Sequence, residues 1–117
     1  MNIAPQITFR HMDTSGALVT LIEGRLAQLE RLTPRITGCR VTVEKAHRQH
    51  QKGNLFAVHV VLSLPGKDIA VSHEQGNNHT LEDAHAAVQH AFDAARRQLE
   101  DHVRVSRGDT KHHDTRA

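Results

Sequence analysis

Histidines are the residues of this sequence with the most potential for metal chemistry, since they make up 11 of its 117 residues. His47 and His50 form an H-x-x-H pattern, and His112 and His113 are adjacent, so either pair could bind a transition metal. A structural zinc site normally has four ligands, usually including thiolates, and Cys39 is the only cysteine. We therefore predict that the chain needs no metal and no other cofactor.

The sequence carries no pattern that is typical of an active site. It has neither a glycine-rich phosphate loop nor a serine in a Gly-x-Ser-x-Gly turn. Cys39 has no defined base beside it and lies at the start of a strand-like run, which favours a small structural residue over a nucleophile. We predict a binding protein without a catalytic residue or a small-molecule substrate.

Basic residues form two groups that could bind an anion such as an RNA phosphate. In the first group, Lys45, Arg48 and Lys52 share a polar segment with His47 and His50. This segment, residues 45–52, is either an anion-binding loop or an exposed connection between two strands.

The second basic group lies on the last predicted helix and consists of Arg96, Arg97 and Arg104. These cations have a simpler alternative, because acidic residues lie four positions away on the same helix. Glu100 could pair with Arg96 or Arg104, and Asp101 could pair with Arg97. Each such pair would contribute only about 0.3–0.5 kcal/mol.

Charge and composition limit the kind of partner. The formal net charge is +2, and residues 104–117, with four basic and two acidic residues, account for all of it. With no Trp or Tyr and only three Phe, the chain has few aromatic side chains that could stack on exposed bases.

The sequence shows no signal peptide and no run of about 18 apolar residues, so we expect a cytoplasmic protein without a membrane partner.

The elements that position these residues follow from the spacing of apolar side chains. Alternation at residues 7–9 and again at 41–43 predicts two short strands. At residues 55–64 every even position is apolar, which predicts a third strand with one buried face. The turn residues Pro65-Gly66 and the alternation at 69–71 predict a fourth strand, antiparallel to the third.

Two helices are predicted from apolar residues spaced by three and four. The first follows possible capping residues at 13–15, carries its apolar stripe from Leu18 to Leu32 and ends before Pro34. The second starts at Leu81, with Thr80 as its cap, and continues for roughly 24 residues. The predicted core consists of Phe56, Val58, Val60, Leu62, Ala84, Val88, Phe92 and Leu99.

The order of elements predicts an α+β fold, β-α-β-β-β-α, in which two helices pack on one face of a four-stranded sheet. Residues 1–103 form this domain. Residues 104–117 consist mainly of Ser, Gly, Asp, Thr, His, Lys and Arg with hardly an apolar residue, and we expect them to form a disordered polar tail.

Short segments within these elements form an ordered set. Residues 25–31 read RLAQLER, residues 64–66 LPG, residues 83–88 DAHAAV and residues 97–99 RQL. In this order they resemble the first helix, the turn between strands and the second helix of the ribosome hibernation-promoting family. That family includes the ribosome-associated inhibitor and the sigma-54 modulation proteins. The resemblance covers about residues 3–104.

The chain departs from the family at four positions. The family usually has lysines where this chain has Gln28, Ala94 and Asp101. It has a tyrosine at the position of His85. Each lost cation that contacts a phosphate weakens binding and reduces its salt dependence. The chain is therefore similar to a short or divergent form of the family.

The resemblance implies a translation regulator that binds the small ribosomal subunit through 16S rRNA, in the mRNA/tRNA channel, and promotes ribosome hibernation under stress. Such binding rests on shape and phosphate contacts. The candidate RNA contacts are Arg25, Arg31, Lys45, Arg48, Lys52, Arg97 and Arg104. The alternative is a protein-interaction or stress-response module that has this fold but has lost strong ribosome binding.

Overall fold

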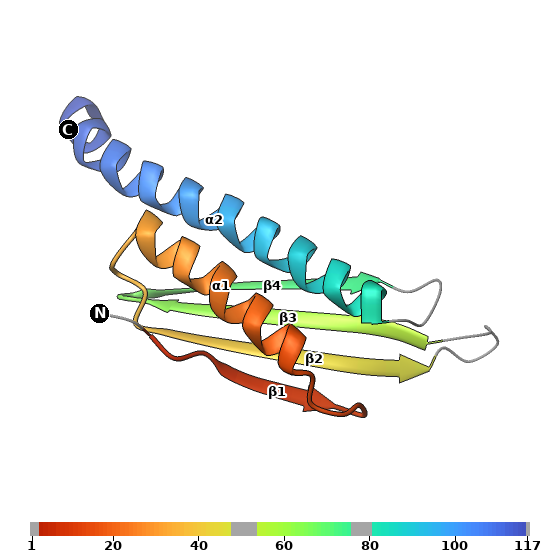
Figure 1. Ribbon diagram of the computed structural model, residues 1–117. Helices are drawn as coiled ribbons and strands as arrows, with labels where there is room; N and C mark the ends of the chain where they lie inside the picture. The colour runs from red at the N-terminus through yellow and green to blue at the C-terminus, as the bar shows by residue number, and fades with distance from the viewer. Residues whose placement is uncertain (1–2, 48–53, 76–80, 117) are drawn as a thin grey trace.

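The apolar periods of the sequence correspond to six elements in the structure. The computed structural model describes residues 3–47, 54–75 and 81–116. In chain order the elements are β1 (Gln6–Arg10), α1 (Gly16–Leu32), β2 (Gly38–His47), β3 (Asn54–Leu64), β4 (Lys67–Gln75) and α2 (Leu81–Arg116). This order confirms the predicted β-α-β-β-β-α arrangement (Figure 1).

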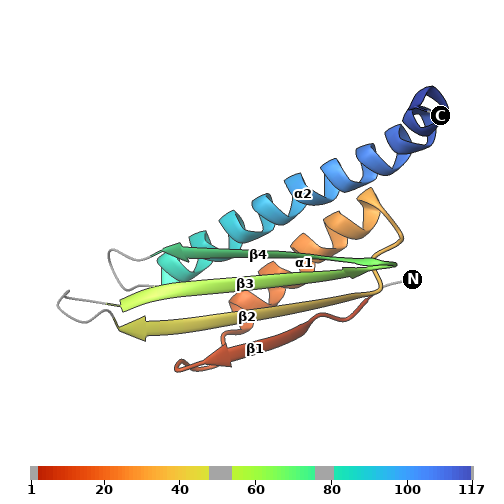
Figure 2. The ribbon, with the colours of Figure 1, turned by 180° about the vertical axis from the view of Figure 1, so that it is seen from behind.

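The four strands form one mixed sheet in the order β1-β2-β3-β4. β1 pairs with β2 in parallel, whereas the β2–β3 and β3–β4 pairs are antiparallel. The parallel pair requires a crossover connection, which α1 supplies. Both helices cover the same face of the sheet, as predicted, and in the described part of the chain no helix covers the other face (Figures 1 and 2).

The core lies between the sheet and the two helices. Along one line across the sheet, Val41 faces Val60 and Val60 faces Val71, and all three side chains are buried. All eight residues predicted for the core are buried: Phe56, Val58, Val60, Leu62, Ala84, Val88, Phe92 and Leu99.

Polar residues satisfy the terminal backbone groups of α1. The Oγ of Ser15, within the predicted capping segment, accepts a hydrogen bond of 3.2 Å from the Leu18 N–H. At the other end, the Thr33 N–H donates to the Leu29 carbonyl. Pro34 follows and lacks an N–H, so the helix cannot continue. The predicted cap of α2, Thr80, lies outside the described residues.

The predicted turn at Pro65-Gly66 joins β3 to β4. Gly66 has a φ of +76°, a region that favours glycine because other residues place a Cβ too close to the backbone. The turn sets Lys67, the first residue of β4, opposite Leu64, the last residue of β3.

Cys39 is a buried residue of β2, in agreement with its interpretation as structural. Its exposed fraction is 4%. Burial, together with the nearby negative charge of Glu30, raises the pKa of the Cys39 thiol to about 11. The thiol is therefore protonated at neutral pH and is a poor nucleophile.

α2 is longer than the apolar repeat predicted. α2 continues to Arg116, and the expectation that residues 104–117 form a disordered polar tail stays a prediction. The segment 104–116 has no proline and one glycine, so no residue in it prevents helical hydrogen bonding. Within the described ranges, no helix has the length and apolar character needed to cross a membrane.

Candidate nucleic-acid interface

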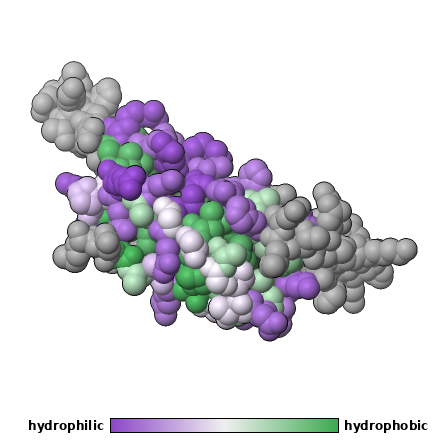
Figure 3. Space-filling view, viewed as in Figure 1, coloured by the Kyte–Doolittle hydropathy of each residue, from purple (hydrophilic) through white to green (hydrophobic). Residues whose placement is uncertain are grey.

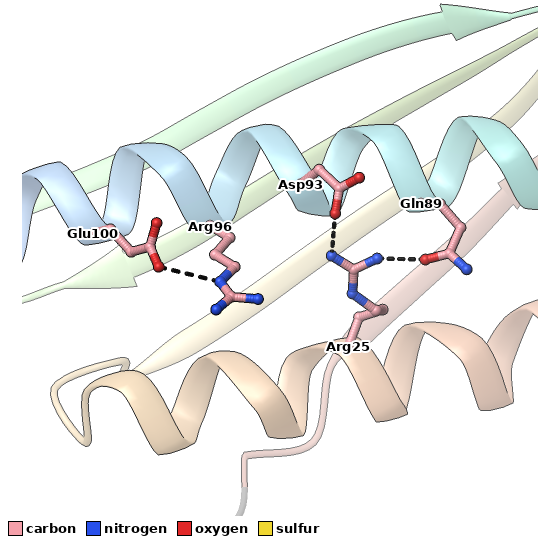
Figure 4. A network of polar contacts seen from close by, with 5 residues as sticks. All are labelled: Arg25, Gln89, Asp93, Arg96 and Glu100. Atoms are coloured by element: carbon pink, nitrogen blue, oxygen red, sulfur yellow. Dashed lines mark hydrogen bonds and ion pairs between the residues drawn. The ribbon is translucent and has the colours of Figure 1, made fainter.

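Arg25 joins the two helices. From α1, its guanidinium donates hydrogen bonds to the side chains of Gln89 and Asp93, one turn apart on α2 (Figure 4). The distance between its Nη2 and the Asp93 Oδ1 is 2.6 Å. The guanidinium carbon also lies 6.0 Å from the centre of the Phe92 ring. Only 14% of the Arg25 side chain is exposed, so it is largely enclosed by the helices.

This contact holds Asp93 in its charged form. The hydrogen bond from Arg25 lowers the pKa of the Asp93 carboxyl against the opposing effect of desolvation, and the positive charges of Arg25, His90 and Arg97 lower it further. A phosphate would have to replace Asp93 as the partner of Arg25. The structure therefore gives Arg25, a candidate RNA contact, a role in positioning α1 on α2.

A groove of about 580 Å³ lies between α1 and α2. We call it the interhelical groove, and its lining residues are Thr20, Leu21, Gly24, Arg25, Gln28, Gln89, Asp93 and Arg96. Its arginine and amide groups can donate hydrogen bonds to phosphate oxygens, and its carboxylate and amide oxygens can accept them from ribose hydroxyls. A Cβ added at Gly24 would meet no atom within 4 Å, so the groove is open at this point.

The arginines of α2 differ in their partners. Arg96 pairs with Glu100 at 3.2 Å, as the four-residue spacing predicted (Figure 4). Arg104 pairs with Asp101, three residues before it, and not with Glu100. Arg97 forms no ion pair with a described residue, and Asp101, which could have paired with it, pairs with Arg104.

Arg31, Arg97 and Arg104 lie on the solvent-facing side of the helix pair, and all three are exposed. Arg97 and Arg104 are seven residues apart, which returns an α-helix to nearly the same face. The two helices run in the same direction (Figure 1). Because Arg25 of α1 contacts residues 89 and 93 of α2, Arg31 is level with about residue 97 of α2. The structure thus brings three of the candidate RNA contacts to one surface.

The exposed surfaces of the two helices differ in character. Figure 3 shows hydrophilic residues gathered over α2 and a paler band over α1. The exposed residues of α1 include the small side chains Gly16, Ala17, Thr20, Gly24 and Ala27. Charged contacts therefore come mainly from α2, while α1 leaves its backbone accessible to a closely approaching partner.

Lys45 lies near the start of α1, away from the exposed helix arginines. It lines a cavity of about 850 Å³ together with residues 11–15 and Phe56. Lys45 is partly buried there. Arg48 and Lys52 lie outside the described residues. The structure therefore does not bring Lys45 together with the cations of the helix pair.

The four departures from the resembled family have different surroundings. Gln28 lines the interhelical groove, and Asp101 pairs with Arg104. Ala94 packs against the core, while His85 is exposed. Asp101 has the largest consequence, because it replaces a cation and also neutralises a neighbouring one.

Sequence reasoning missed the contribution of Gln89 and Asp93 to this site. Arg25 and Asp93 are 68 residues apart in the chain, so no local period connects them. The sequence did carry one signal for this contact. Gln89 and Asp93 are polar, lie about one helical turn apart, and directly follow the predicted core residues Val88 and Phe92.

The described residues include no group of three or more His, Cys, Asp or Glu side chains placed to hold a metal ion. His47 is the last residue of β2, and His50, the second histidine of the H-x-x-H pattern, lies outside the described residues. His73 of β4 and His90 of α2 have ring centres 4.9 Å apart, which is a packing contact between sheet and helix.

Two helices on one face of a four-stranded mixed sheet, with exposed arginines on the helix pair, define a small α+β domain. Residues 6–106 match the family described as sigma 54 modulation protein / S30EA ribosomal protein. The chain belongs to this family, which confirms the resemblance found in the sequence.

Two solved structures have the same fold. The Thermus thermophilus Protein Y N-terminal domain matches with a TM-score of 0.65 and 22% identity, over 86% of this chain and 98% of that one. A ribosomal subunit interface protein from Coxiella burnetii matches with a TM-score of 0.66 and 22% identity, over 87% and 97%. At this identity the likeness shows the fold alone. No curated protein matches the chain in sequence.

Proposed function

We propose that this protein binds the small ribosomal subunit through 16S rRNA, in the mRNA/tRNA channel, and holds the ribosome idle under stress. It would act in the cytoplasm as a translation regulator and not as an enzyme. The observation that carries the proposal is the family match over residues 6–106. The shared fold with a ribosomal subunit interface protein from Coxiella burnetii supports it.

The helix pair supplies the contact surface in this proposal. Arg31, Arg97 and Arg104 are exposed on one side of it, where they can displace counterions from phosphates. The chain has no Trp or Tyr, which favours recognition of folded RNA by shape and phosphate over stacking on bases. Arg25 would act mainly by fixing the distance between the helices.

A second candidate is a protein-interaction or stress-response module that lacks strong ribosome binding. It is favoured by the neutralisation of helix cations, since Arg25, Arg96 and Arg104 each pair with a carboxylate of α2. Each of these arginines has to exchange its partner before it binds a phosphate, which lowers the affinity of the helix surface for RNA.

Sedimentation with purified small ribosomal subunits at near-physiological salt tests the proposal. The wild-type protein should sediment with the subunit, and its affinity should fall steeply as salt rises. Two variants separate the candidate surfaces: Arg97→Ala with Arg104→Ala on α2, and Lys45→Ala with Arg48→Ala and Lys52→Ala. If a set of residues contacts phosphates, its substitution by alanine should weaken binding to the small subunit at least about tenfold.

Normal binding by the triple variant, with weak binding by the α2 variant, would make the helix pair the contact surface. If the wild-type protein fails to associate even at low salt, the ribosomal function is rejected and the interaction module takes its place.

A further inference from the structure

Four elements meet at the end of the sheet where α1 ends. There α1 ends at Leu32, β2 begins, β3 ends at Leu64 and β4 begins at Lys67. The Thr37 N–H donates to the Ser63 carbonyl at 2.8 Å, and the Thr37 hydroxyl lies 3.1 Å from the same oxygen. The α1–β2 loop and the β3–β4 turn therefore lie side by side, as both views show (Figures 1 and 2).

Four basic side chains surround this end, and we call them the α1-end rim: Arg31, Arg35, Lys67 and Arg97. Arg31 is in the last turn of α1. Arg97, on α2, is level with Arg31. All four side chains are exposed.

Arg35 is held in place by its loop. The residues Thr33 and Ile36, on either side of the Pro34-Arg35 pair, are buried. The Arg35 N–H donates to the Thr33 Oγ1 at 3.2 Å. The backbone is thus anchored at both sides, while the Arg35 side chain extends into solvent.

Lys67 lies on the helix-covered side of the sheet. It is opposite Leu64 in the register, and side chains alternate along a strand, so it shares a face with Ile69. Leu64 and Ile69 are both buried under the helices. The acidic neighbour Asp68 lies on the other face, opposite Ser63.

The rim cations also differ from the other arginines of the helix pair in having no ion-pair partner. Over the described ranges, none of the four rim residues forms an ion pair, whereas Arg25, Arg96 and Arg104 all do. Arg31 also lies at the negative end of the α1 dipole, which would stabilise it there without any ligand. That explanation does not extend to Lys67, at the start of a strand, or to Arg97, within a longer helix.

We propose that the α1-end rim docks on the phosphates of a folded RNA, with Arg35 and Lys67 as contacts in addition to Arg31 and Arg97. This inference rests on the proposed function and names a part of its RNA-binding surface. None of its cations forms an ion pair with a described residue, although the charge of Arg97 acts on the nearby Asp93 carboxylate. The four residues come from three separate elements and a loop, so they can contact phosphates along a curved RNA backbone.

The test compares two double variants that remove the same charge from different faces. Arg35→Ala with Lys67→Ala removes rim cations. Arg10→Ala with Arg40→Ala removes two exposed cations from β1 and β2, whose register positions put them on the helix-free face of the sheet. Binding to purified small subunits and to a short RNA duplex is measured over a range of salt, and thermal unfolding checks that each variant is folded.

The rim variant should bind small subunits about tenfold more weakly, and its plot of log affinity against log salt should be less steep by about 1.5–2. The control should stay within about twofold of the wild-type protein. The charge-conserving variant Arg35→Lys with Lys67→Arg should retain most of the affinity.

Equal effects of the rim variant and the control overturn the inference while leaving the proposed function intact. Binding of the duplex but not of small subunits by the wild-type protein rejects the proposed function. The rim inference is then rejected as well if the rim variant and the control bind the duplex equally. If the wild-type protein binds neither the small subunit nor the duplex, the rim inference and the proposed function are both rejected.

Discussion

Gly24 and Gly66 are exposed glycines in two different backbone conformations. Gly24 is within α1, where glycine is less favourable than alanine by about 0.5–1 kcal/mol, and a Cβ there would meet nothing within 4 Å. Gly66 also has open space around its Cα, but its φ is +76°. The same substitution should therefore have opposite effects at the two sites.

We expect Gly24→Ala to raise the free energy of unfolding by about 0.5–1 kcal/mol and Gly66→Ala to lower it by about 1 kcal/mol. Urea unfolding of the two variants measures both values. A loss of stability in Gly24→Ala would mean that α1 does not continue through this position.

The Arg25–Asp93 contact should make stability depend on pH. The pKa of Asp93 is lower in the folded protein, chiefly through the hydrogen bond from Arg25, so its stabilising contribution is present above about pH 4. It is lost as the pH falls through the folded-state pKa. Because half of the Asp93 side chain is exposed, we expect a contribution of only about 0.5–1 kcal/mol.

At pH 7, Asp93→Asn should have a free energy of unfolding lower by this amount, measured in urea. At a pH low enough to protonate Asp93 in the folded protein, the variant should be as stable as the wild-type protein, because both then carry a neutral group. Glu100→Gln is the matched control, because it breaks an ion pair within α2 and leaves the contact between helices intact. An equal deficit of Asp93→Asn at both pH values would show that the ion pair contributes nothing.

At the scale of elements, α2 holds the sheet through one apolar face. Phe92 lies in the middle of this face and is fully buried. Phe92→Ala should lower the free energy of unfolding by about 3–5 kcal/mol, through lost burial and the cavity left behind. Val105→Ala on the same helix should change it by less than about 0.5 kcal/mol, because Val105 is exposed. Urea unfolding measures both, and a small effect of Phe92→Ala would contradict this packing.

Elements with a clear apolar period could be predicted from the sequence. The alternation of β3 and the three-and-four spacing of α2 are local consequences of one buried face, so Val58 and Phe92 could be placed before the structure was known. The Arg25–Asp93 contact could not, because it depends on how two separate helices align. The extent of α2 was also missed, since its last turns have no apolar face to reveal them.

At the scale of the molecule, the buried core occupies only part of α2. Among the residues of α2 up to Val105, Leu99 is the last that is buried, and the helix continues to Arg116. The division of the chain at residue 103 into a folded domain and a polar segment thus stays a prediction that a truncation can test.

A chain without residues 106–117 should keep its free energy of unfolding within about 0.5 kcal/mol. A chain that also lacks residues 97–105 loses Leu99 and should be less stable by at least about 2–5 kcal/mol. Thermal and urea unfolding of both truncations decide the matter, and a large loss from the first would give the final segment a structural role.

The parallel pairing of β1 with β2 has a consequence for local opening. β1 is a five-residue edge strand bonded to one neighbour, and α1 separates it from that neighbour in the chain. β2, β3 and β4 follow one another as antiparallel neighbours, and α2 packs on the last two. In native-state hydrogen exchange, the amides of β1 should therefore lose protection at a lower free energy than those of β3, in a partial unfolding that leaves the three-stranded meander and α2 closed. Equal protection of β1 and β3 would mean that the whole sheet opens as one unit.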